Sequence, residues 1–302
     1  MAIHSITPKD RADWLARRAE DITSTDVAAL FDCSPYCTAF ELWHRKKDGT
    51  IVELEPSDRM RWGVRLQDSI AHGIAEDQGW TIRRMDEYMR DDELMIGASF
   101  DFAIGDDGLL EIKNVDSLQF KDGWIVDGDS IEAPAHIELQ LQHQLAVSGR
   151  AFAYIGALVG GNRVVLIKRE PDAKIIAAIK SKVKAFWQSI ADNKPPTPNF
   201  ERDAEMISKL YGYAEVGKVK TADEEIEALA AKYREAGQAE KAAQGLKEAA
   251  KAELLMLIGD AEKVKGATFS ISAGMIGPKH VEYDRDGYRD FRLHWKRSKG
   301  DK

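Results

Sequence analysis

Cysteine is nearly absent from this 302-residue sequence, which contains only Cys33 and Cys37. Two thiols are too few for a disulfide framework, and no second pair completes a zinc site. With His44 nearby, the Cys-x3-Cys spacing could form half of a metal site, but two small residues around a turn explain the pair better. The sequence therefore predicts neither a disulfide-stabilised nor a zinc-stabilised fold.

Long apolar runs are also missing, since no stretch approaches the ~20 residues that a membrane helix needs. The N-terminal MAIHSITPKDR lacks the apolar centre of a signal peptide. Hydrophobic residues make up 44% and charged residues 31% of the chain, as in an ordinary globular protein. These features predict a cytoplasmic protein without a membrane partner.

Basic residues are not in excess either. The 51 acidic residues outnumber the 43 Lys and Arg residues and give a net charge of −8. This balance argues against a protein whose whole surface wraps nucleic acid. It does not exclude a local basic groove, because phosphate binding depends on where the Lys and Arg lie.

Prolines cluster at Lys194–Pro198, where they cannot continue a helix, and predict a boundary between residues 1–198 and 199–302. Before it, the pattern predicts a helix over 56–78, three strands, a helix over 136–148, a hairpin over 151–169 and a helix over 172–192. This order predicts an α/β core with a mixed central sheet flanked by helices.

The segment beyond the boundary is rich in Ala, Glu and Lys over about 222–259 and predicts a long helix. Two rows repeat every seven residues, but charge interrupts one of them, so we expect a helix packed at its ends or a hairpin bent near Gly237 or Gly245. A β-hairpin with a basic tail is predicted to follow. Its interleaved aromatic and basic residues could stack on bases or form a solvated edge hairpin: Tyr283, Arg285, Tyr288, Arg289, Phe291, Arg292, His294 and Trp295.

Three ionisable residues lie in the apolar stretch 95–115, which predicts two strands, Ile96–Ile104 and Leu109–Asn114, around a tight turn. Glu111 and Lys113 are two apart and should project from one face of the sheet, with Asp101 on the neighbouring strand. The group could hold a hard divalent cation through oxygen ligands or form a buried ion-pair network without chemistry.

Two further polar groups have functional and ordinary interpretations. Arg18 and Thr25 flank a predicted helix start and could bind a phosphate, although capping alone explains the threonine. Gln140 and Gln144 lie one turn apart on the 136–148 helix, and such a pair is usually solvated surface.

In combination, these features resemble the YqaJ-type viral recombinase family, the PD-(D/E)xK nucleases that include bacteriophage lambda exonuclease. The resemblance extends from about Arg18 to about Tyr154. It rests on the Arg18 to Thr25 spacing and on four motifs in the family's order: Trp62-Gly63-Val64-Arg65-Leu66-Gln67, Ser99-Phe100-Asp101, Glu111-Ile112-Lys113 and Leu139-Gln140-Leu141-Gln142. It implies a restriction-endonuclease-like core.

The resemblance also implies roles for individual residues. Asp101, Glu111 and the carbonyl of Ile112 would bind Mg²⁺, with Mn²⁺ as an alternative and two ions per site. Lys113 would position or activate the attacking water, and Gln140 would help to hold that water or the phosphate.

Two further positions of the family's site are altered in this sequence. Arg18 and Thr25 would bind a terminal 5′-phosphate, with Thr25 in place of the usual serine. Gln67 stands where the family usually has a metal-binding glutamate, so the second ion would bind more weakly unless Asp68 or His72 compensates.

The implied activity is a 5′-to-3′ exonuclease acting on double-stranded DNA ends. Such an enzyme would leave 3′ single strands for a single-strand annealing protein during phage-type recombination. The resemblance further implies a homo-oligomeric ring, with a trimer as the expected form, of a phage or prophage protein in the cytoplasm of a bacterial host. The alternatives are a repair nuclease of the same fold and a catalytically weak DNA-binding scaffold protein.

Overall fold

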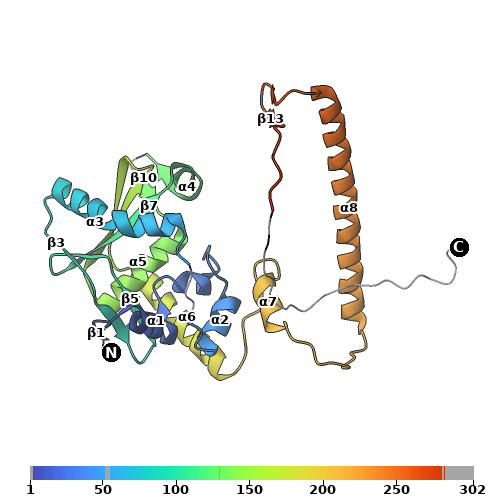
Figure 1. The fold of residues 1–302 in the computed structure, drawn as a ribbon. Helices are drawn as coiled ribbons and strands as arrows, with labels where there is room; N and C mark the ends of the chain where they lie inside the picture. Colours follow the sequence, from blue (N-terminus) through green and yellow to red (C-terminus); the bar gives the residue numbers. More distant parts are fainter. Residues whose placement is uncertain (1–2, 52–54, 129, 281, 283–302) are drawn as a thin grey trace. The chain divides into compact units, whose positions relative to one another are not determined.

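The computed structural model describes residues 3–51, 55–128, 130–280 and 282 (Figure 1). The chain forms two compact units, Met1–Ile207 and Ser208–Lys302, which are described separately.

A five-stranded sheet forms the centre of the first unit. Its spatial order is β11 (Arg163–Arg169), β10 (Phe152–Val159), β7 (Gly108–Val115), β6 (Phe102–Ile104) and β3 (Ile82–Arg84). β7 and β10 are parallel, whereas the other neighbours are antiparallel. The predicted mixed sheet is therefore confirmed.

A second sheet of four strands adjoins the first along the chain. Its order is β1 (Ile3–Ile6), β4 (Tyr88–Asp91), β5 (Ile96–Ser99) and β2 (Ile22–Thr23). The prediction of one strand over Ile96–Ile104 is wrong, because the chain leaves the four-stranded sheet after Ser99 and enters the five-stranded sheet at Phe102. Asp101 lies in this break rather than within a strand.

Helices cover both faces of the five-stranded sheet. On one face lies α3 (Asp58–Gln78), whose Ile70 and Ile74 pack with Leu110 and Ile112 of β7. The other face packs against α5 (Ala135–Ser148) and α6 (Ala173–Ala191), and the alternating strand residues Leu109 and Ile155 belong to that core. The remaining elements of this unit are α1 (Arg11–Glu20), η1 (Val27–Phe31), α2 (Ala39–Lys47), α4 (Ser117–Gly123), and the hairpin of β8 (Ile125–Asp127) with β9 (Ser130–Glu132).

The proline cluster does not end the first compact unit. Asp203 is buried and accepts hydrogen bonds from the Thr38 hydroxyl and from the Asn199 amide, the latter at 2.7 Å. Arg202 donates to the Ser34 carbonyl at 2.7 Å. The compact unit therefore continues to Ile207, in the helix α7 (Ala204–Leu210), whereas a domain boundary at residue 198 stays a prediction.

One uninterrupted helix, α8 (Glu224–Ile258), dominates the second unit (Figure 1). The Asp223 side chain caps its start by accepting from the Ile226 amide, and the helix passes through Gly237 and Gly245. The prediction of a bend there is wrong, because each glycine costs only about 1 kcal/mol in a helix otherwise built from strong helix formers. Strands β12 (Lys263–Lys265) and β13 (Ser270–Ser272) then form an antiparallel hairpin.

The predicted aromatic and basic tail over 283–302 lies outside the described residues. Within the described ranges, no helix is long and apolar enough to cross a membrane.

Candidate active site

The unequal lengths of β6 and β7 create the central feature of the site. β6 pairs with β7 only as far as Phe102 opposite Leu110, so the following part of β7 has no partner from β6. Asp101 occupies that position with its side chain, and its carboxylate Oδ2 accepts from the Ile112 amide at 2.8 Å. The N–H and carbonyl of one strand residue point to the same side, so the Ile112 carbonyl is also directed toward Asp101.

Glu111 lies at the centre of a hydrogen-bonded cluster between β7 and α5. Lys113 Nζ lies 2.6 Å from Glu111 Oε1, and Gln140 Nε2 donates to the same oxygen at 2.6 Å. The Gln140 carbonyl oxygen in turn accepts from Lys113 Nζ at 3.0 Å. This cluster confirms that Glu111 and Lys113 project from one face and brings predicted site residues from two distant segments together.

Gln144 is a member of the cluster to which the sequence assigned no role. Its Nε2 donates to Glu111 Oε2 at 2.8 Å and to the Ser99 carbonyl at 3.1 Å. Glu111 is only 6% exposed and Gln144 only 2%. The expectation of a solvated glutamine pair is wrong for both Gln140 and Gln144, because α5 is covered on several sides and buries them against β7.

The charges of the cluster fit a hard cation. Burial, and then the nearby Glu111, raise the pKa of Asp101 to about 7. Burial alone would lower the pKa of Lys113, but Glu111 and Asp101 raise it. The buried Glu111 carboxylate and the half-buried Asp101 carboxylate therefore share one ammonium, and the Ile112 carbonyl adds a third oxygen-bearing group of the type that Mg²⁺ and Mn²⁺ bind. The residues present fit a divalent ion.

Gln67 also reaches this cluster, from α3. Its side chain lies close enough to the Asp101 carboxylate to lower the pKa of that group, and its Oε1 accepts from Arg84 at 3.4 Å. The side-chain nitrogen of Gln67 therefore faces Asp101. Its side-chain oxygen could bind a metal only if the amide group flipped. The neighbouring Asp68 pairs with Arg84, and His72 lies edge-on to a phenylalanine ring. Within the described ranges, no group of three or more His, Cys, Asp and Glu side chains could hold a metal.

A second polar group lies at the end of α1. Arg18 donates to the Thr25 hydroxyl at 3.0 Å and to the Thr23 hydroxyl at 3.5 Å, and the two hydroxyls are 3.1 Å apart. The guanidinium carbon also lies 4.5 Å from the centre of the Trp14 ring. The structure therefore brings Arg18 and Thr25 together and adds Thr23 between them.

Buried charges hold this second group in place. Lys46 donates to the Arg18 and Asp21 carbonyls at 2.6 Å each and pairs with the Asp26 carboxylate at 2.9 Å. Burial alone would raise the pKa of Asp26, but Lys46 and Arg18 lower it. Asp26 then accepts from the Thr23 amide at 3.1 Å. The sequence carried no signal for Lys46, which comes from a separate helix, α2.

The two groups do not touch each other directly, but both contact Ser99. Thr23 pairs with Gly97 in the register of β2 and β5. Two residues further on, the Ser99 hydroxyl accepts from Trp14 Nε1 at 2.8 Å, while its carbonyl accepts from Gln144. Ser99 lies two residues before Asp101, so one short segment contacts both groups.

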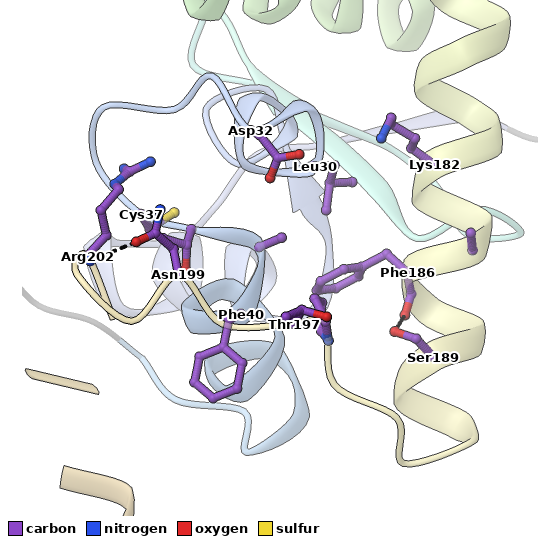
Figure 2. Close-up of a pocket in the computed structure, with 14 residues that line it drawn as sticks. Leu30, Asp32, Cys37, Phe40, Lys182, Phe186, Ser189, Thr197, Asn199 and Arg202 are labelled. Carbon is purple, nitrogen blue, oxygen red and sulfur yellow. Dashed lines mark hydrogen bonds between the residues drawn. The ribbon is translucent and has the colours of Figure 1, made fainter. Parts of the chain in front are cut away.

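A cavity of about 570 Å³ lies elsewhere in the first unit, between η1, α2, α6 and the segment 196–202 (Figure 2). Its wall includes Asp32, Cys37, Lys182 and Arg202. None of the described lining residues belongs to either polar group. Both cysteines are free, and burial raises the pKa of the Cys37 thiol to about 11, which keeps it protonated.

The fold and the cluster together define the PD-(D/E)xK class: a mixed sheet flanked by helices, with Asp101, Glu111 and Lys113 converging beside β7. Residues 13–151 match the sequence profile of the YqaJ-like viral recombinase domain. This stretch is therefore similar to that domain, in agreement with the resemblance seen in the motifs.

Individual proteins are similar to this chain over longer stretches. "Uncharacterized protein YqaJ" of Bacillus subtilis (strain 168) is 28% identical over 214 residues, which cover 69% of this chain and 66% of that protein. This chain thus spans just under two thirds of that relative's length. The alkaline exonuclease LHK-Exo from Laribacter hongkongensis has a TM-score of 0.48 at 21% identity, covering 66% of this chain and 99% of that one. A phage related exonuclease from Haemophilus somnus 129PT has a TM-score of 0.41 at 15% identity, covering 62% and 89%.

Proposed function

We propose that this protein is a metal-dependent deoxyribonuclease that hydrolyses phosphodiester bonds at the cluster around Glu111. The observation that supports this most is the convergence of the buried Glu111 carboxylate, the half-buried Asp101 carboxylate and the Lys113 ammonium beside the stretch of β7 that β6 leaves unpaired. A bound Mg²⁺ or Mn²⁺ pair would lower the pKa of a water and stabilise charge on the reacting phosphate. Asp101, Glu111 and the Ile112 carbonyl would hold the ions, with Gln67 beside them.

The remaining residues of the cluster would orient the reactants. Lys113 would hold the attacking water by hydrogen bonding or balance the charge of the phosphate. Gln140 contacts both Lys113 and Glu111, so it would fix the ammonium relative to the carboxylate. An amide is suited to this because it donates to one partner and accepts from the other.

The proposed substrate is the 5′ end of double-stranded DNA, degraded in the 5′-to-3′ direction. Arg18 supports this proposal, because its guanidinium fork and the adjacent Thr23 and Thr25 hydroxyls are suited to a terminal phosphate. The resulting 3′ strand would pass to a single-strand annealing protein. The family resemblance further suggests a ring-shaped homo-oligomer, such as a trimer, acting in the cytoplasm of a bacterial host.

The decisive experiment is digestion of linear duplex DNA with Mg²⁺ and with a chelator. We expect Asp101→Ala to abolish cleavage, because the substitution removes a proposed metal ligand. Binding of the duplex should persist. Asp106→Ala is the matched control, since Asp106 lies in the exposed turn of the same hairpin. Cleavage by the chelated enzyme, or equal activity of both variants, would refute the proposed chemistry.

A catalytically weak DNA-binding protein is a second candidate, favoured by Gln67 in place of a carboxylate. In that case wild-type protein would bind duplex ends without shortening them at any Mg²⁺ or Mn²⁺ concentration, and Asp101→Ala would leave the function of the protein unchanged. A repair nuclease of the same fold would instead cleave DNA equally well with and without a 5′-phosphate.

A further inference from the structure

The long helix α8 presents apolar side chains that nothing in the described part of the chain buries. No residue of α8 is buried, and Leu254 and Leu257 are 45% and 83% exposed. Helices in proteins owe most of their stability to packing of an apolar face. Among the described residues, these side chains of the five-heptad helix are therefore available to a partner.

Two rows of residues along α8, apolar at both ends of the helix, follow a heptad repeat. Its first row (position a) is Ile226, Tyr233, Glu240, Lys247 and Leu254, and its second row (position d) is Leu229, Ala236, Ala243, Ala250 and Leu257. Along the second row, leucines lie at both ends and alanines in the middle, whereas the first row has Glu240 and Lys247 near its centre. The alternating spacing of three and four residues is that of a coiled-coil seam.

The two charged residues of the first row exclude a parallel pair of identical helices. In a parallel pair, each residue of a row faces its own copy, so Glu240 would face Glu240 and Lys247 would face Lys247. Like charges placed in a seam destabilise it. An antiparallel pair places each residue of one row against the other row instead.

The antiparallel arrangement makes the helix complementary to itself. With Glu240 opposite Ala243 of a second copy, the successive layers place Tyr233 opposite Ala250, Leu229 opposite Leu254 and Ile226 opposite Leu257. Each large central residue then meets a small one, and the apolar ends meet each other. The centre of this arrangement lies at the middle of Glu224–Ile258, so the two helices overlap along their whole length.

Opposite charges also meet in this register. Lys247 of the second copy lies four residues along the axis from Glu240, or about 6 Å at 1.5 Å per residue, within reach of two long side chains. On the flank, Lys232 and Glu253 of the second copy are offset by only two residues, or about 3 Å. Each pair occurs twice because the contact is symmetric.

We propose that α8 pairs in antiparallel orientation with α8 of a second copy of this chain. This two-fold contact concerns assembly and does not depend on the proposed nuclease chemistry. It would give an even number of copies, so it cannot by itself form a three-membered ring.

Cross-linking of the full-length chain tests the orientation. Co-expressed Leu229→Cys and Leu254→Cys chains should form a disulfide-linked dimer on mild oxidation, because these positions face each other. Leu229→Cys alone should not exceed the wild-type background from Cys33 and Cys37, because its two copies lie about 38 Å apart. Cross-linking of Leu229→Cys alone would show a parallel pair, and the absence of any cross-link above background would refute the pairing; either result overturns the proposal.

Charge reversal tests the interface independently. Glu240→Lys and Lys247→Glu each place like charges side by side, so each should halve the particle mass in sedimentation equilibrium. The double variant should restore the wild-type particle mass, because the two opposite charges then simply exchange positions. An unchanged mass for both single variants would overturn the proposal and point to another partner for α8.

Discussion

Gln144 offers a sharp test of how the carboxylate cluster is built. In Gln144→Leu, Glu111 loses the donor at 2.8 Å and the Ser99 carbonyl loses the donor at 3.1 Å. A hydrogen bond to a charged group contributes about 1.5–3 kcal/mol and a neutral one about 0.5–1.5 kcal/mol. Leucine has a similar volume, so little cavity cost is added. The free energy of unfolding should fall by about 2–4.5 kcal/mol.

Two measurements separate a positioning role of Gln144 from a structural one. Urea unfolding in the presence of a chelator gives the stability change without metal. Calorimetric titration with Mn²⁺ gives metal affinity without DNA. Loss of a residue that orients a metal ligand typically weakens affinity 10–100-fold, so we expect a change of about that size for Gln144→Leu.

Gln142→Leu is the matched control on the same helix. Gln142 is equally buried, but it donates to the Glu170 carbonyl at 2.9 Å and accepts from the Asp172 amide at 2.8 Å, away from the cluster. It should lose stability and keep wild-type Mn²⁺ affinity. If the two variants bound Mn²⁺ with equal affinity, Gln144 would contribute only to packing, and its role in orienting Glu111 would be refuted.

The remaining predictions concern single positions. Gln67→Glu should lower the Mg²⁺ concentration for half-maximal cleavage roughly tenfold, about 1.4 kcal/mol, because it adds a carboxylate beside the cluster; an unchanged requirement would contradict the placement of Gln67. Arg18→Met should remove the preference for 5′-phosphorylated over 5′-hydroxyl duplexes, which competition digestion would measure. Gly97→Ala should cost about 1–3 kcal/mol in urea unfolding, because its methyl carbon would overlap the buried Tyr88 hydroxyl. Gly73→Ala in α3 meets no atom within 4 Å and should stabilise by about 0.5–1 kcal/mol.

The sequence predicted those parts of the site that depend on local periodicity. Glu111 and Lys113 share a face because side chains alternate along a strand, and that requires no knowledge of the rest of the fold. The position of Asp101 was predicted less well. The break between β5 and β6 depends on which distant strands pair with each, and Ile96–Ile104 has a continuous apolar pattern that hides it.

Burial of polar residues was the harder part of the prediction. A helical wheel of α5 shows glutamines on several faces, which is typical of solvent exposure. In the structure, Gln140, Gln142 and Gln144 are all buried, because η1, α6, β5, β10 and β4 pack around the helix. Each glutamine is retained there by a specific partner, and those partners lie 28 to 45 residues away in the sequence, out of reach of any local pattern.

The position of Ser99 explains why the two polar groups are expected to act together. Its hydroxyl fixes Trp14, against which Arg18 stacks, and its carbonyl fixes Gln144, which holds Glu111. A shift of this segment would displace both groups at once, because hydrogen bonds tolerate little change in length. The distance between a bound 5′ terminus and the reacting phosphate would then be set by β5 itself, so the number of nucleotides removed in each cut would be a property of the fold.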